Sequence, residues 1–182
     1  MIELDKESHN KDALNHNAVE VPKMPSINHS FIHARLTGLF LDHERFTPFV
    51  ELSLDASQID LSQFGLKAKD DLVPDVCLYE GIHQFDPLGD ATKRRDMPAL
   101  AVEVLSPTQS TEDILAKFKA YFALGIKSCW LVIPPTKVIT VYSTQGFENF
   151  DTKDTEIIDH TLQIKLPISK IFGKTTAASS TG

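Results

Sequence analysis

Two almost continuously apolar segments constrain the fold most strongly. Residues 99–105 (Ala-Leu-Ala-Val-Glu-Val-Leu) contain one charged side chain, and residues 128–133 (Ser-Cys-Trp-Leu-Val-Ile) contain none. Prolines follow shortly after both segments, at Pro107 and at Pro134. A β-strand is apolar along its whole length when both of its faces are buried, which requires other layers on both sides of the sheet. We therefore predict two central strands of a covered sheet.

The remaining elements are predicted from periodicity and from helix-terminal signals. A helix is expected from Ser26, a good N-cap, to near Asp42, because apolar residues recur there with a helical period. A second helix is expected over 111–124, where Ser110 and Asp113 have the spacing of a capping box. Strands are predicted at 49–54, 72–79 and 138–142, a hairpin at 155–166, and loops at 55–71 and 80–98. This order of elements predicts a mixed α/β domain.

Length and composition suit one domain with tails. The chain has 182 residues, of which 42% are hydrophobic and 24% are charged, as in ordinary globular proteins. We expect a mobile leader at 1–17, a short edge strand at 18–23, a single domain over 18–173 and a flexible tail at 174–182. Cys77 and Cys129 lie in apolar runs, so we expect both to be buried, reduced thiols.

Charge and hydropathy exclude some classes of protein. Lysine and arginine number 18 and aspartate and glutamate number 25, so the net charge is −7. This charge argues against a generally basic protein that coats DNA, although a nuclease with a locally basic cleft stays possible. The N-terminus is too acidic for a signal peptide, and no apolar stretch approaches the roughly 20 residues of a spanning helix. We expect a cytoplasmic protein with no membrane partner.

Two carboxylates interrupt the apolar strands. Asp75 and Glu103 lie where an acidic side chain is disfavoured. Gly89 is midway between them in the sequence, so a hairpin centred on Gly89 would place the two carboxylates opposite each other, about 5 Å apart at Cβ. Like charges this close are costly to bury, and a divalent cation with a preference for oxygen ligands would relieve the repulsion. The alternatives are that both carboxylates are exposed or that lysines pair with them.

The predicted helix over 111–124 offers a third candidate. Asp113, Lys117 and Tyr121 are spaced four residues apart and share one face. Lys117 lies beside the apolar stripe that should pack on the sheet, so its ammonium could reach the two carboxylates. The alternative is a surface ion pair between Asp113 and Lys117, worth about 0.3–0.5 kcal/mol.

These residues carry a family resemblance that spans about Val19 to Phe172. In order and spacing they resemble the Uma-two family of restriction-endonuclease-like proteins, within the PD-(D/E)XK nuclease superfamily. The matching residues are Asn28-His29-Ser30, Pro74-Asp75, Ala101-Val102-Glu103-Val104-Leu105-Ser106-Pro107, Asp113, Lys117, Tyr121, Gly125 and Trp130-Leu131-Val132. The resemblance implies a restriction-endonuclease-like fold, in which helices flank a central, mostly antiparallel or mixed sheet.

The resemblance also implies roles for individual residues. Asp75 and Glu103 would ligate the metal, with the carbonyl of Val104 as an extra ligand. The superfamily's lysine usually stands two residues after the second acid, where this chain has Leu105. Lys117, on the following helix, is the natural substitute. Asp113, Tyr121 and His29 would support the site.

The implied chemistry is hydrolysis of DNA phosphodiester bonds with Mg²⁺ or Mn²⁺. We expect a homodimer, because enzymes of this kind commonly cut both strands. Lys93, Arg94 and Arg95 would contact the DNA backbone. The alternative for these three is a solvated loop, because Asp86, Asp90 and Asp96 surround them. Two other interpretations of the whole chain stay open. One is a non-catalytic module that keeps the nuclease fold to bind nucleic acid or protein, and the other is a plain structural domain.

His29 and His33 have helical i, i+4 spacing and could bind a metal ion. No glutamate accompanies them in the zinc-protease pattern, and the alternative is that His33 is simply exposed.

Overall fold

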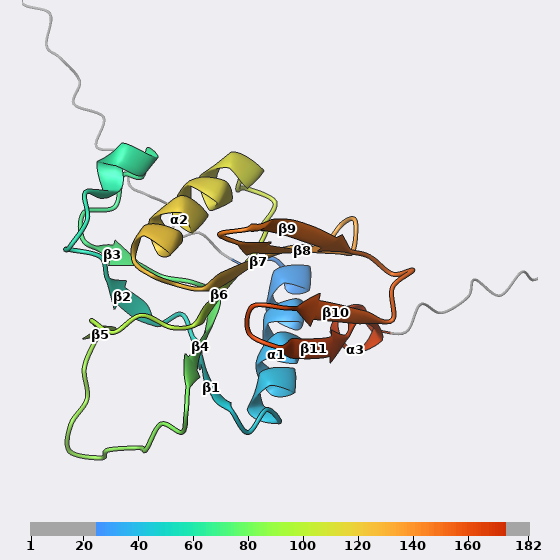
Figure 1. Ribbon diagram of the computed structural model, residues 1–182, viewed down its shortest axis with the longest axis horizontal. Helices are drawn as coiled ribbons and strands as arrows, with labels where there is room; N and C mark the ends of the chain where they lie inside the picture. The colour runs from blue at the N-terminus through green and yellow to red at the C-terminus, as the bar shows by residue number, and fades with distance from the viewer. Residues whose placement is uncertain (1–24, 174–182) are drawn as a thin grey trace, which may run out of the picture.

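The computed structural model describes residues 25–173, and a six-stranded mixed sheet is its centre (Figure 1). The strand order is β1-β4-β6-β7-β8-β9, and each neighbouring pair is antiparallel except β6 and β7, which are parallel. The strands of this sheet are β1 (Phe46–Val50), β4 (Val76–Glu80), β6 (Leu100–Val104), β7 (Ser128–Ile133), β8 (Val138–Ser143) and β9 (Gly146–Phe150). The fold is the mixed α/β class predicted from the sequence.

Helix α1 (Ile27–Leu41) covers one face of the sheet, together with the hairpin β10 (Glu156–Asp159) and β11 (Ile164–Pro167) and the short helix α3 (Ile168–Phe172). Ser26 caps α1 as predicted, because its side chain accepts a hydrogen bond from the His29 amide. Ile32, Leu36 and Phe40 face the sheet and are buried. They pack in one core with the alternate residues of β6, which are Leu100, Val102 and Val104.

Helix α2 (Thr111–Ala123) lies on the opposite face with a small second sheet. Ser110 and Asp113 form the predicted capping box at its start. The small sheet has the order β3 (Asp71–Leu72), β2 (Ser53–Asp55), β5 (Lys93–Arg94), and the 3-10 helix η1 (Leu61–Phe64) adjoins it. Ala101 of β6 belongs to this second core. Since side chains alternate along a strand, Glu103 faces α2, and this decides which residues can reach it.

The predicted register between β4 and β6 is confirmed. Val76 is opposite Val102 and Leu78 is opposite Leu100, which is the pairing expected for a hairpin centred on Gly89. The pairing begins at Val76, so Asp75 lies one position before the start of β4 rather than within a strand. Both predicted central strands, at 99–105 and 128–133, are present and almost completely buried.

Two predicted strands are each divided between the two sheets. The strand predicted at 49–54 is split at Glu51, which has a left-handed φ of 50°, into the end of β1 and β2. The strand predicted at 72–79 is split at Pro74 into β3 and β4. The two crossings lie side by side, because the Glu51 amide donates a hydrogen bond to the Asp75 carbonyl at 3.2 Å. Asp75 therefore lies where the chain passes from one sheet to the other.

Other differences concern short or exposed elements. Strand β9, helix α3, the 3-10 helix η1 and the two-residue strand β5 were not predicted, and the last two lie within predicted loops. The hairpin predicted at 155–166 and the strand predicted at 138–142 are confirmed as β10–β11 and β8. The predicted leader at 1–17, edge strand at 18–23 and tail at 174–182 lie outside the described residues. Within 25–173, no helix is long and apolar enough to cross a membrane.

Candidate active site

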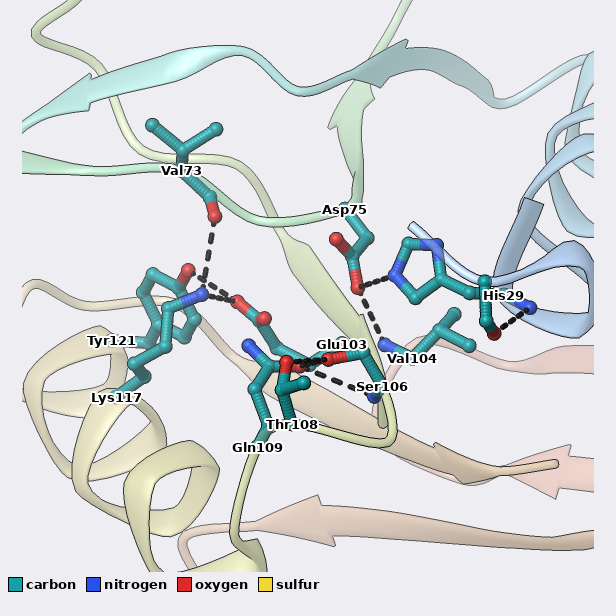
Figure 2. Close-up of polar contacts among 11 residues, drawn as sticks. His29, Val73, Asp75, Glu103, Val104, Ser106, Thr108, Gln109, Lys117 and Tyr121 are labelled. Atoms are coloured by element: carbon teal, nitrogen blue, oxygen red, sulfur yellow. Dashed lines mark hydrogen bonds and ion pairs between the residues drawn. The ribbon is translucent and has the colours of Figure 1, made fainter. Parts of the chain in front are cut away.

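Asp75 is held by contacts from two different elements (Figure 2). The Val104 amide, at the end of β6, donates a hydrogen bond of 2.6 Å to Asp75 Oδ2. The ring of His29, on α1, is 3.2 Å from the same oxygen through Nε2. A carboxylate can only accept, so Nε2 carries the proton in this contact. The Asp75 side chain is 20% exposed, which leaves one side of the carboxylate open.

Glu103 is a buried carboxylate with two donors on one oxygen. Its side chain is only 2% exposed. Its Oε1 accepts from the Tyr121 hydroxyl at 2.8 Å and forms an ion pair with the Lys117 ammonium. Burial raises the pKa of Glu103 above the usual value for a glutamate, and the negative charge of Asp75 raises it further, whereas Lys117 and Tyr121 lower it. The negative charge of Asp75 therefore acts directly on Glu103 and disfavours its ionised form.

The Lys117 side chain crosses from α2 to the sheet, as Figure 2 shows. Besides Glu103, its Nζ donates a hydrogen bond of 3.2 Å to the Val73 carbonyl. Lys117 therefore makes a partly buried contact with Glu103. Asp113 belongs to the capping box that starts α2, the helix that carries Lys117, and its predicted supporting role remains a prediction.

Tyr121 lies one helical turn after Lys117 and is fully buried. Burial raises the pKa of its hydroxyl well above the usual tyrosine value, and the neighbouring Glu103 carboxylate raises it further. The hydroxyl therefore stays protonated and serves Glu103 as a hydrogen-bond donor. Tyr121 is both a core residue and a polar partner of the site.

The acidic pair has oxygen atoms available for a cation. The hydrogen bonds that the described residues make to Asp75 and Glu103 gather on Oδ2 and on Oε1, which leaves Oδ1 and Oε2 without a protein donor. Mg²⁺ is commonly bound by one or two carboxylates plus several waters, so two such oxygens fit that ion. Within 25–173, no group of three or more histidine, cysteine, aspartate or glutamate side chains converges on one point. Any ion here would keep much of its hydration shell.

The three basic residues of the long loop each lie beside an acid. Lys93 Nζ is 2.6 Å from Asp71 Oδ1, and Arg95 Nε is 3.6 Å from Asp55 Oδ2.

Arg94 differs from its two neighbours in having an aromatic contact as well. It pairs with Asp96, and its guanidinium lies over the Tyr79 ring at 4.0 Å from the centroid. The Arg95 side chain is 92% exposed and is therefore the most accessible of the three cations. The predicted DNA contacts of all three remain predictions.

Sequence reasoning did not anticipate the backbone groups of the site. The Val104 amide holds Asp75, and the Val73 carbonyl holds Lys117. Main-chain donors and acceptors are present at almost every position, so they give no signal in a sequence. The predicted ligand role of the Val104 carbonyl is a separate matter from this amide contact, and it remains a prediction.

Comparison with known proteins identifies the family of this chain. A family model with the description "Putative restriction endonuclease" matches residues 3–169. A solved structure described as a "putative nuclease belonging to DUF820", from Anabaena variabilis ATCC 29413, is similar with a TM-score of 0.65 and 22% identity, covering 82% of each chain. At that identity the likeness concerns the fold. No curated protein matches the chain. The family model covers most of the sequence, and the chain belongs to this family, Uma2.

Proposed function

We propose that this protein is a metal-dependent endonuclease that hydrolyses phosphodiester bonds in DNA. The observation that carries the proposal is the contact of Lys117 with Glu103, because it supplies a cation from α2 where the strand has Leu105. Burying a carboxylate is costly even when a lysine from another element pairs with it, and this cost favours a functional site over a purely structural pair. Membership of a restriction endonuclease family supports the choice of DNA as substrate.

Asp75 and Glu103 would hold Mg²⁺ or Mn²⁺ through Oδ1 and Oε2, with the Val104 carbonyl as a third ligand. When bound, such an ion polarises the scissile phosphate and lowers the pKa of a coordinated water. The chain's part is to keep the two carboxylates fixed. The Val104 amide and His29 fix Asp75, while Tyr121 fixes Glu103.

Lys117 would act at the reacting phosphate. Its ammonium lies between Glu103 and the Val73 carbonyl and remains 20% exposed, so a phosphate oxygen in the site could accept a hydrogen bond from it. A positioned cation stabilises the negative charge that develops on the phosphate oxygens in the transition state. It also orients the attacking water through a hydrogen bond.

The substrate would contact the long loop between β4 and β6. Arg95, with its exposed guanidinium, is the best placed of the three basic residues to meet a DNA phosphate, and Lys93 and Arg94 would follow by exchanging their acidic partners. Because one site cuts one strand, we propose a homodimer as the form that cuts both strands of a duplex.

Cleavage of supercoiled plasmid in Mg²⁺ or Mn²⁺ tests this function. We expect cleavage by the wild type and a loss of about 100-fold or more in Lys117→Ala, because the transition state loses its positioned cation. Lys119→Ala is the matched control, since Lys119 is exposed on the same helix and should be dispensable. Equal cleavage by Lys117→Ala and Lys119→Ala would contradict the role of Lys117. DNA binding without cleavage by the wild type would favour the non-catalytic module instead.

A further inference from the structure

Two ring nitrogens on α1 have no hydrogen-bond partner although both are buried. They are His29 Nδ1 and His33 Nε2, and among the residues that the structure describes they are the only buried side-chain nitrogen or oxygen atoms in this condition. His29 as a whole is 6% exposed. An unsatisfied buried polar atom is costly, and a bound water or ion is a common reason for one. Two such atoms on successive turns of one helix point to a shared occupant.

The contact with Asp75 decides what His29 can offer to that occupant. Because Nε2 donates its proton to Asp75 Oδ2, the neutral ring presents a lone pair at Nδ1. Histidines that bind a metal ion usually donate their other ring N–H to a carboxylate or carbonyl, which fixes the tautomer and the orientation of the ring. The Asp75–His29 pair has this arrangement.

The two rings are close enough to share one ion. Their centroids are 6.0 Å apart and their planes are nearly perpendicular. A Zn–N bond of about 2.1 Å places a zinc ion about 3.2 Å from the centre of each ring, so a tetrahedral N–Zn–N angle places the two ring centres about 5.2 Å apart. The observed separation is about 0.8 Å longer, a difference that small rotations of the two side chains would close.

The same two histidines line an open groove of about 450 Å³ between α1 and the end of β1. Exposure of His33 was the alternative to metal binding in the sequence analysis, but the residue is partly buried. The groove also includes Glu51, a carboxylate that favours a cation there. Since no three ligating side chains converge within 25–173, water would complete the coordination.

We propose that His29 Nδ1 and His33 Nε2 bind one transition-metal ion of the Zn²⁺ class in this groove, separately from the acidic pair. The proposal does not depend on the proposed nuclease function. Imidazole ligands favour Zn²⁺, Co²⁺ and Ni²⁺, whereas Mg²⁺ prefers oxygen ligands. The two sites should therefore differ in which ions they accept.

Calorimetric titration of the full chain with Zn²⁺, in excess Mg²⁺, tests the site. The Mg²⁺ competes at the acidic pair and leaves the histidine pair free. We expect a saturable tight equivalent in the wild type that weakens about tenfold or more in His33→Ala and in His29→Ala. His160→Ala removes an exposed imidazole and should leave this equivalent unchanged. Titration with Co²⁺, followed by its visible absorption, should show nitrogen ligation that disappears in the same two variants.

Two further variants separate loss of the histidine site from a folding defect and from Zn²⁺ binding at the acidic pair. His33→Gln retains the size of the side chain, so if thermal melting shows that it folds like the wild type, loss of Zn²⁺ binding cannot be a folding defect. Glu103→Gln should abolish Mn²⁺ binding at the acidic pair and leave Zn²⁺ binding intact, which separates this proposal from the proposed function. The proposal is overturned if the wild type binds no Zn²⁺, if the histidine variants bind it as tightly as the wild type, or if Glu103→Gln alone removes the binding.

Discussion

At the scale of single residues, Glu103 is the centre of the site. It is a carboxylate among apolar side chains, and its Oε1 has a cationic partner in Lys117 and a neutral partner in Tyr121. Desolvation nevertheless dominates, because burial raises the pKa of Glu103 despite both partners. The folded protein thus holds a proton on this group to a higher pH than an exposed glutamate would. Below that raised pKa, a bound cation would have to displace the proton.

This balance predicts a pH dependence of Mn²⁺ binding. Below the raised pKa of Glu103, each bound ion releases a proton, so the affinity should rise by up to about tenfold per pH unit and level off above that pKa. Calorimetry in two buffers with different ionisation enthalpies counts the released protons. Binding that is independent of pH, with no proton released, would contradict the assignment of Glu103 as a ligand.

The same pKa shift predicts the direction of a stability change. Between the usual glutamate pKa of 4.5 and the raised value, the folded state binds more protons than the unfolded state. The free energy of unfolding should therefore fall as the pH rises through this window. Glu103→Gln should remove this part of the pH dependence in urea unfolding experiments. A slope that Glu103→Gln leaves unchanged would assign it to another group.

At the scale of elements, strand β6 supplies the acid and helix α2 supplies the lysine. Leu105 stands two residues after Glu103, just beyond β6, so alternation places position 105 on the same face as Glu103. The capping box of Ser110 and Asp113 fixes the start of α2, almost three turns before Tyr121. A lysine could therefore approach Glu103 either from the strand, at position 105, or from the helix, at position 117.

A lysine moved from α2 to β6 tests this equivalence. We expect Leu105→Lys, made in the Lys117→Ala background, to restore part of the plasmid cleavage, because the new ammonium approaches Glu103 from the strand. Leu105→Met in the same background is the control, since it changes the side chain without adding a charge. Restoration by both substitutions, or by neither, would count against a shared position for the two lysines.

The sequence predicted the strands and helices of the site better than the points, at Glu51 and Pro74, where the chain passes from one sheet to the other. The register of β4 and β6 was predictable because the two strands pair as a symmetric hairpin about Gly89. The break at Glu51 was not, because alternation of apolar residues continues across it and the left-handed φ depends on tertiary contacts. Strand β9 was missed because most of its residues are exposed, which weakens any apolar pattern.

At the scale of the whole molecule, two apolar cores enclose the central sheet. One core lies under α1 and the other lies under α2 and the small sheet. Both cysteines, Cys77 and Cys129, are fully buried in strands of that sheet. Burial raises the pKa of the Cys77 thiol to about 12 and that of Cys129 well above its usual value.

The closed cores predict that the thiols are unreactive in the native protein. Titration with an aromatic disulfide reagent at neutral pH should find no fast thiol, because neither sulfur is accessible or ionised. After unfolding in guanidinium chloride it should find both of the chain's cysteines. A thiol that reacts rapidly before unfolding would show that one face of the sheet opens readily.

The central claim is that Asp75 and Glu103 together bind a divalent cation. Calorimetric titration with Mn²⁺, comparing the wild type with an Asp75→Asn/Glu103→Gln double variant, tests it most directly because it needs no knowledge of the DNA sequence. A short duplex DNA is included in a second titration, since a phosphate can complete the coordination of the ion. We predict saturable binding in the wild type that the double variant loses. Equal binding by both proteins, or binding by neither even with DNA present, would contradict it.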